Sequence, residues 1–295
     1  MSQSVVLVTG SSTGIGLATV KQLAEAGYRV YATVRNPGCS PELQALAATL
    51  NNVIIELMDV TSIDSVNQTV SKINIKEKRI DVLINNAGFG VYGPSETHSI
   101  NQIKQLFKTN VLGVVHLTKA VLPIMRKQNH GTIVNLSSVA GVIPSGNIPH
   151  YAACKAYVEH LSASDRLHLA KWNIKVILIQ PGPVVTNFIG RTKDGESFTQ
   201  EENPYKETIS SNRKAWEKMM EEGQTPEEVA KVIKMALESS NPKLWYQTSQ
   251  VISDKIAKHH IDITGNGRVP QPTSLTTKSI HAIKTQIQIT PNSKL

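Results

Sequence analysis

The fold is decided by the stretch Val5-Val6-Leu7-Val8-Thr9-Gly10-Ser11-Ser12-Thr13-Gly14-Ile15-Gly16. This stretch leads from an apolar strand through a glycine-rich turn into a helix. In a doubly wound parallel sheet, the helix that begins at this junction binds the pyrophosphate of a dinucleotide. Gly10 suits the tight turn, Gly14 lets the backbone approach the phosphates, and Gly16 allows close packing of helix on strand. The loop residues Ser12, Thr13 and Ile15 are included in this predicted cofactor site. The spacing is GxxxGxG rather than GxGxxG, so an ordinary glycine turn is the alternative.

The first two thirds of the chain alternate apolar runs with longer amphipathic segments. Strands are expected at Val5–Thr9, Arg29–Val34, Val53–Leu57, Val82–Asn85, Thr132–Leu136 and Lys175–Ile179, and helices at Ile15–Ala26, Ser62–Asn74, Ile100–Arg126 and Tyr151–Lys171. Most of these strands are apolar throughout, as strands covered by helices on both faces are. The pattern therefore predicts an α/β protein with a doubly wound parallel sheet, the Rossmann fold.

The last third of the chain is more polar. From Pro181-Gly182-Pro183 to about Gly223 it is rich in charged residues, and such an insertion after a strand suits a substrate lid at 190–223. Thr225-Pro226-Glu227-Glu228 has the N-cap, proline and acidic residues of a helix start, so a helix is predicted to about Glu238. We expect one domain over residues 1–260 and a weakly ordered tail over 261–295.

Composition excludes several classes of protein. The 31 basic and 23 acidic residues give a net charge of +8, but the basic residues are scattered and no nucleic-acid-binding motif is present. No apolar run reaches the roughly 18 residues of a membrane helix, and the start of the chain does not resemble a signal peptide. The two cysteines, Cys39 and Cys154, form neither a metal motif nor a disulfide framework. We expect a soluble cytoplasmic protein without a metal.

The end of the second predicted strand bears on cofactor choice. An acidic residue there would bind the adenosine ribose of NAD, but this chain has Val34 followed by Arg35. The guanidinium of Arg35 suits a 2′-phosphate, and the hydroxyl of Ser12 is a second contact for it, so NADPH is predicted. A solvated arginine at a strand end is the alternative.

Two further segments are candidates for the adenosine half of the site. Asp59-Val60 follows the third strand, where Asp59 suits the adenine amino group or, equally, a helix cap ahead of Thr61-Ser62. Asn86, Ala87 and Gly88 follow the fourth strand, where small residues let the backbone lie against a nucleoside. The asparagine side chain is alternatively a turn residue.

Tyr151 and Lys155 are the predicted centre of catalysis. They are four residues apart on a predicted helix, so both side chains lie on one face and approach the same ligand. Lowering a tyrosine pKa by about 3 units needs roughly 4 kcal/mol, which a shielded cation at about 4 Å supplies at an effective dielectric constant near 20. An ordinary helical surface pair is the alternative for this short pattern.

Ser138 and Asn110 complete the predicted catalytic group. Ser138 follows a strand that ends at the same sheet edge as the glycine loop, so its hydroxyl is placed to bond a substrate carbonyl; a turn serine is the alternative. Asn110 is unfavourable within a long helix and is predicted to bend it and to bind a proton-relay water. A satisfied buried asparagine is the alternative.

These motifs, in their order and spacing, resemble those of the short-chain dehydrogenase/reductase family: Thr-Gly-x3-Gly-Ile-Gly at 9–16, Asn-Asn-Ala-Gly at 85–88, Asn110, Ser138, Tyr151 with Lys155, and Pro181-Gly182. The resemblance implies that Tyr151 is the general acid and that Lys155 lowers its pKa and holds the nicotinamide ribose. It further implies that Ser138 orients the carbonyl and that Asn110 completes the relay. Pro181, Gly182, Val184 and Thr186 would hold the nicotinamide.

Four segments resemble the 17β-hydroxysteroid and retinol dehydrogenase branch of that family: residues 30–35, 86–94, 182–188 and 225–230. The branch implies a bulky apolar alcohol or carbonyl substrate, so that with the NADPH predicted from Val34 and Arg35 the expected reaction interconverts a ketone or aldehyde and an alcohol. The family resemblance also implies a homodimer or homotetramer formed through the helices at 100–126 and 151–171. A 3-oxoacyl-type reductase and a non-catalytic NADPH-sensing interaction protein are the alternatives.

Overall fold

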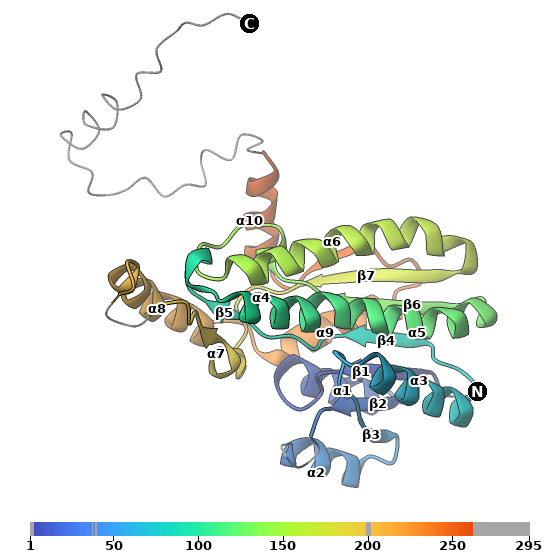
Figure 1. The fold of residues 1–295 in the computed structure, drawn as a ribbon. Coiled ribbons are helices and arrows are strands. Elements are labelled where there is room, and N and C mark those ends of the chain that lie inside the picture. The colour runs from blue at the N-terminus through green and yellow to red at the C-terminus, as the bar shows by residue number, and fades with distance from the viewer. Residues whose placement is uncertain (1–2, 37, 39, 199–201, 262–295) are drawn as a thin grey trace, which may run out of the picture. The chain divides into compact units, whose positions relative to one another are not determined.

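A seven-stranded parallel sheet is the core of the computed structural model, which describes residues 3–36, 38, 40–198 and 202–261 (Figure 1). Its order is β3-β2-β1-β4-β6-β7-β9, and every neighbouring pair is parallel. The strands are β1 (Val5–Thr9), β2 (Arg29–Val34), β3 (Val53–Leu57), β4 (Val82–Asn85), β6 (Gly131–Leu136), β7 (Ile174–Gln180) and β9 (Trp245–Gln247). The predicted doubly wound fold is therefore confirmed.

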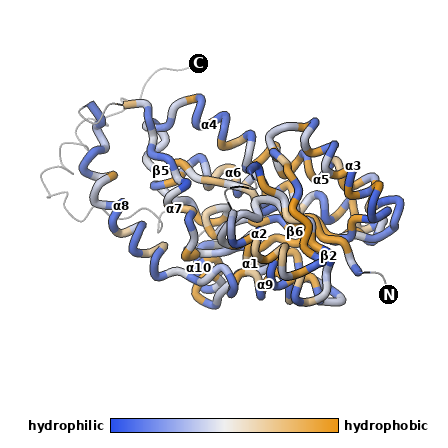
Figure 2. Tube along the Cα trace, turned by 90° about the horizontal axis from the view of Figure 1, so that it is seen from below, coloured by the Kyte–Doolittle hydropathy of each residue, from blue (hydrophilic) through white to orange (hydrophobic). Residues whose placement is uncertain are grey.

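Helices cover both faces of the sheet. Alternate strand residues point to opposite faces, and in strands such as β1 the residues on both faces are apolar and buried. Val6 and Val8 of β1 join an apolar cluster with α1 (Gly14–Glu25), α2 (Pro41–Thr49) and α9 (Pro226–Glu238). Val5 and Leu7 join a second cluster with α3 (Ile63–Glu77) and α5 (Gly113–Gln128). Figure 2 shows the resulting distribution, with β2 and β6 strongly hydrophobic.

The helix predicted over 100–126 consists of three segments. α4 (Ile100–Phe107) leads into a π-helical turn, η3 (Lys108–Leu112), and α5 follows directly. Asn110 lies within the π turn, so the predicted distortion at this asparagine is present in the form of a widened turn. α6 (Pro149–Leu169) is uninterrupted and carries Tyr151 and Lys155.

The predicted capped helix after residue 225 is α9. The Thr225 hydroxyl accepts a 3.2 Å hydrogen bond from the Glu228 amide, and the Glu228 carboxylate accepts a 2.7 Å bond from the Thr225 amide. This reciprocal capping box fixes where α9 begins.

The segment predicted as a lid contains three elements. They are part of α7 (Phe188–Arg191), β8 (Lys193–Asp194) and α8 (Lys206–Glu221). β8 pairs with β5 (Val91–Tyr92), and α8 is largely hydrophilic (Figure 2). The chain described ends with α10 (Gln250–Ile261), and the predicted tail beyond Ile261 lies outside the described residues.

Candidate active site

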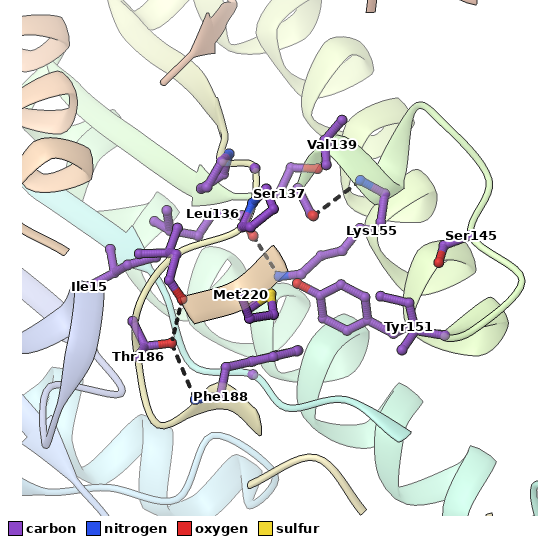
Figure 3. A pocket seen from close by; sticks show the side chains of 18 of the residues that line it. Ile15, Leu136, Ser137, Val139, Ser145, Tyr151, Lys155, Thr186, Phe188 and Met220 are labelled. Carbon is purple, nitrogen blue, oxygen red and sulfur yellow. Dashed lines mark hydrogen bonds between the residues drawn. The ribbon is translucent and has the colours of Figure 1, made fainter. Parts of the chain in front are cut away.

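One pocket of about 490 Å³ brings together most of the predicted site residues. It lies where β1, β4, β6 and β7 end, because the carboxyl ends of parallel strands meet at one edge of the sheet. Its walls include Gly10, Thr13, Gly14, Ile15, Asn86, Ala87, Gly88, Ser138, Tyr151, Lys155, Pro181, Gly182, Val184 and Thr186. Figure 3 labels Ile15, Tyr151, Lys155 and Thr186 among them. The predicted residues that do not line it are Ser12, Gly16, Arg35, Asp59, Val60 and Asn110.

The glycine loop is tightly constrained at each of its glycines. Gly10 and Gly14 have φ values of +67° and +57°, a conformation that side chains with a Cβ adopt rarely. A Cβ on Gly16 would lie 2.3 Å from the Gly10 carbonyl oxygen, so α1 packs against the loop too closely for any side chain there. The predicted roles of Gly10 and Gly16 in backbone geometry agree with these contacts.

The start of α1 has the properties of an anion site. Its N-cap, Thr13, makes no side-chain capping bond, and the first turn carries no acidic residue. The first N–H groups of a helix carry partial positive charge and need partners. This cradle of glycines and free amides fits the phosphates of a dinucleotide, which Thr13, Gly14 and Ile15 would hold.

Asn86 holds the β4 end of the pocket against the glycine loop. Its side-chain Nδ2 donates to the carbonyl oxygens of Thr9 at 2.9 Å and Gly10 at 3.0 Å. The Thr9 hydroxyl accepts bonds from the amides of Asn86 and Ala87 at 2.9 and 3.0 Å. The asparagine is thus a turn-holding residue, as the alternative interpretation had it, and it positions Ala87 on the pocket wall.

At the end of β2, where the adenosine half of the cofactor was predicted to bind, Val34 is buried and Arg35 is exposed. Arg35 forms no hydrogen bond or ion pair with any residue the structure describes. Asp59 accepts 2.8 Å bonds from both the amide and the hydroxyl of Thr61 through a single oxygen, Oδ1. Ser62 is the N-cap of α3, so Asp59 stabilises the turn that precedes this helix.

Tyr151 and Lys155 are both buried, and they lie on the same face of α6. The Lys155 Nζ atom lies 5.6 Å from the centre of the Tyr151 ring and donates a 2.6 Å hydrogen bond to the Leu136 carbonyl oxygen (Figure 3). Burial lowers the pKa of Lys155 to about 8, against the effects of Cys154 and Glu159, which raise it. The Lys155 ammonium therefore loses its proton at a lower pH than a lysine in solvent does.

Burial raises the pKa of Tyr151 above its usual range, while a hydrogen bond with the Ser138 hydroxyl lowers it. Ser138 also accepts a 3.1 Å bond from the Ala140 amide and so begins the 3₁₀ turn Val139–Gly141. The serine therefore shapes the turn, as the alternative interpretation had it, and its predicted bond to a substrate carbonyl stays a prediction. The neighbouring Ser137 hydroxyl is buried without a hydrogen-bond partner among the described residues.

Asn110 is fully buried in the π turn and does not line the pocket. Its Nδ2 donates to the Phe89 carbonyl oxygen at 2.8 Å, and its Oδ1 accepts from the Phe89 amide at 3.1 Å. The side chain is therefore satisfied by backbone, as the alternative interpretation had it. A Cβ on Gly88 would lie 3.0 Å from Asn110 Oδ1 and 3.8 Å from Lys155 Nζ, which places Gly88 between the two.

A largely apolar wall completes the pocket; its residues were not singled out from the sequence, although four of them lie in the segment 190–223 predicted as a substrate lid. The Phe188 ring lies 5.4 Å from the Tyr151 ring, centre to centre. Further wall residues come from distant elements: Ile143, Ile148, Arg191, Trp216, Met219, Met220, Ile252 and Lys255. Trp216 and the two methionines, apolar residues within a polar segment, are the signal that could have identified part of this wall.

The described part of the chain contains no cluster of three or more His, Cys, Asp or Glu side chains able to hold a metal ion. Among the same residues, no helix combines the length and the apolar character needed to cross a bilayer.

Comparison with known proteins identifies the family. The chain matches the short chain dehydrogenase family over residues 4–197. It is 34% identical over 258 residues to 3-ketodihydrosphingosine reductase of Bacteroides thetaiotaomicron, covering 88% of this chain and 92% of that protein. It is 36% identical over 271 residues to retinol dehydrogenase 8 of Bos taurus, covering 88% of this chain and 86% of that protein.

A solved closed form of serine dehydrogenase complexed with NADP+ superposes with a TM-score of 0.71 and 28% identity, covering 82% of this chain and 93% of that chain. The protein therefore belongs to the short-chain dehydrogenase/reductase family and is an oxidoreductase. The family resemblance drawn from its motifs is confirmed.

Proposed function

We propose that the protein transfers hydride between NADP(H) and a bulky apolar ketone, aldehyde or alcohol. The observation that carries the proposal is a single pocket that joins the glycine loop, the group Ser138, Tyr151 and Lys155, and a wall of apolar side chains. Each of these three parts supplies one requirement of the reaction, namely cofactor binding, proton transfer and substrate binding.

When bound, the nicotinamide supplies or accepts the hydride. Tyr151 gives a proton to the carbonyl oxygen during reduction and takes it back during oxidation. The Ser138 hydroxyl, which lowers the pKa of Tyr151, orients that oxygen, and Lys155 holds positive charge beside the tyrosine ring. Gly88 leaves room for Lys155 on one side, and the Leu136 carbonyl fixes its ammonium on the other.

The proposed preference for NADP(H) over NAD(H) is based on the residues at the end of β2. No carboxylate stands at Val34, and Arg35 offers an unengaged guanidinium fork there for a 2′-phosphate. The NADP+ of the related serine dehydrogenase structure supports the same choice.

The proposed substrate class is inferred from the side chains that line the pocket wall. Ile148, Phe188, Trp216 and Met220 offer apolar surface next to Tyr151, and methionine adapts to irregular apolar ligands. Both 3-ketodihydrosphingosine and retinol, in the names of the two relatives, are long and mainly apolar molecules. A lipid-like, retinoid or steroid carbonyl is therefore the proposed substrate.

We further propose self-association into a dimer or tetramer through the face formed by α4, η3 and α6. Phe107, Leu112 and Tyr157 expose large apolar side chains along these elements, with exposed fractions of 37%, 46% and 44%. Light scattering of the purified protein tests this assembly. Location in the cytoplasm stays a prediction from the sequence.

The experiment that tests the function follows oxidation of NADPH and of NADH by nicotinamide absorbance, against steroid ketones, retinal, long-chain keto compounds, aliphatic aldehydes and 3-oxoacyl thioesters. Turnover with an apolar carbonyl and NADPH, abolished in Tyr151→Phe, is the expected result. Turnover of the 3-oxoacyl thioesters alone would show that the enzyme is a 3-oxoacyl-type reductase and would rule out the proposed substrate class. Tight NADPH binding without any turnover would instead favour a cofactor-sensing role.

A further inference from the structure

Arg191 connects the two sides of the pocket. It is the last residue of α7, which follows β7, and its Nη2 atom donates a 3.2 Å hydrogen bond to the Ser12 hydroxyl of the glycine loop. The two residues are 179 positions apart in the sequence. Arg191 lines the same pocket as Tyr151 and the start of α1.

The charges around the pocket all have one sign. Lys155, Arg191 and Lys255 line it, and no Asp or Glu does so among the described residues. Lys155 is buried and bonded to the Leu136 carbonyl. Arg191 has five N–H donors and meets only the neutral Ser12 hydroxyl, with no ion pair to any described residue. An exposed cation in this position is suited to an anionic ligand.

α7 is held in place from both ends. The Thr186 hydroxyl accepts a 3.2 Å bond from the Phe188 amide, and the Thr192 hydroxyl donates a 2.8 Å bond to the Phe188 carbonyl. Thr186 also lies against the glycine loop, because a Cβ on Gly14 would be 3.0 Å from its Cγ2 atom. The guanidinium of Arg191 is therefore presented to the loop by a fixed short helix.

Phe188 and Arg191 are three residues apart and lie on one side of α7. Phe188 contacts the Tyr151 ring, and Arg191 contacts the loop at the start of α1. The same helical turn thus reaches both the proposed proton donor and the proposed phosphate site.

We propose that Arg191 binds a phosphate group of the dinucleotide and so holds α7 over the pocket. The inference rests on the proposed function and adds a cofactor contact that none of the motifs contains. A planar guanidinium pairs with two phosphate oxygens at once, which a hydroxyl partner cannot match. Ser12 occupies one of its donors and keeps the side chain at the loop.

Binding measurements test this directly. Dissociation constants for NADPH, NADH and 2′,5′-ADP are measured from quenching of protein fluorescence, to which Trp216 of the pocket wall contributes. The variants are Arg191→Ala, Arg191→Lys and, as a control, Lys193→Ala, which removes one exposed positive charge two residues away and outside the pocket. Thermal unfolding of each variant checks that the fold is retained.

Arg191→Ala is expected to weaken NADPH binding by about tenfold to a hundredfold, the usual loss for a hydrogen bond to a charged group. Arg191→Lys should recover part of the loss, and Lys193→Ala should stay within about twofold of the parent. Equal losses for NADPH and NADH identify the pyrophosphate as the partner. A loss confined to NADPH and 2′,5′-ADP identifies the 2′-phosphate.

Binding by Arg191→Ala within about twofold of the parent for all three ligands would overturn the inference while leaving the proposed function intact. A parent protein that binds none of these ligands would overturn both. The two failures are therefore distinguishable in one set of titrations.

Discussion

Lys155 and Tyr151 lie one helical turn apart on α6, with the lysine Nζ atom 5.6 Å from the centre of the tyrosine ring and neither side chain more than 9% exposed. Burial works against the charged form of each side chain, since it lowers the pKa of the lysine and raises that of the tyrosine. Tyr151 is neutral below its raised pKa and so carries no such cost, whereas the charged form of Lys155 is kept buried at a cost in stability, and this cost makes the lysine accessible to experiment.

Tyr151→Phe is expected to lower kcat by about 10²- to 10⁴-fold, the usual contribution of a positioned proton donor. Its dissociation constant for NADPH should change by less than about threefold, because the ring and its contact with Phe188 remain. Tyr157→Phe on the same helix is the matched control, since Tyr157 is 44% exposed. Equal activity of the two variants would remove Tyr151 from the mechanism.

Lys155→Met should change how stability depends on pH. The pKa of the lysine falls from 10.5 to about 8 on folding, which costs about 3 kcal/mol below pH 8. Between about pH 8 and 10.5 the unfolded chain binds more protons at this site, so the cost disappears as pH rises. The stability of the variant relative to the parent should therefore fall by about 2 to 3 kcal/mol between pH 7 and pH 10.

Urea denaturation at both pH values measures this difference, and only the comparison between variant and parent is used, so that other titrating groups cancel. Lys127→Met is the control, because Lys127 is exposed on α5. The control should show no such pH dependence. A constant difference between Lys155→Met and the parent would mean that the buried ammonium carries no such cost.

Gly16→Ala should destabilise the protein by about 1 to 3 kcal/mol, a usual cost of overpacking. The added methyl group would lie 2.3 Å from the Gly10 carbonyl oxygen and 2.6 Å from Asn86 Nδ2. The glycine loop must then shift, so NADPH binding should weaken as well. Gly146→Ala is the control, since a methyl group added there would meet nothing within 4 Å beyond its chain neighbours, and it should leave both properties unchanged.

Val34→Asp combined with Arg35→Ala should reverse cofactor preference. The carboxylate would repel a 2′-phosphate and accept bonds from the ribose hydroxyls, and the guanidinium that suits the phosphate would be gone. The ratio of kcat/KM for NADPH to that for NADH should fall by about tenfold to a hundredfold or more. The ratio is measured within one protein, so any loss of stability from a charge at the buried Val34 cancels. An unchanged ratio would exclude the end of β2 as the site of discrimination.

Most of the sheet could be predicted from the sequence because its strands are continuous apolar runs. β2, for example, is buried at Val30 through Val34, and its predicted bounds are those of the structure. β9 was missed, since Trp245–Gln247 is three residues long, at the sheet edge and only partly buried. α2 and α10 were missed as well, because each buries few residues and neither shows a marked apolar stripe.

The site was predictable where a motif determines backbone geometry, and not where packing between distant segments determines it. The glycine loop and the Tyr151 and Lys155 pair are defined by local spacing, and the structure places both in one pocket. Arg191, Trp216 and Ile252 reach that pocket only because α7, α8 and α10 fold against it. The polar segment 190–223 predicted a lid, but no local pattern indicated which of its residues, or that Ile252, would line the pocket. The side chain of Asn110 likewise pairs with the Phe89 backbone, a partner that only the tertiary structure reveals.

The place of β1 in the sheet has a consequence for synthesis of the protein. β1 precedes the other strands of this sheet in the sequence, yet it pairs with β2 on one side and with β4 on the other, where Val6 faces Val82. A nascent chain leaving the ribosome therefore carries this apolar strand with one edge open until Val82–Asn85 has been translated. Unpaired apolar edges recruit other chains, so a translational pause in this interval should increase aggregation and demand for chaperones.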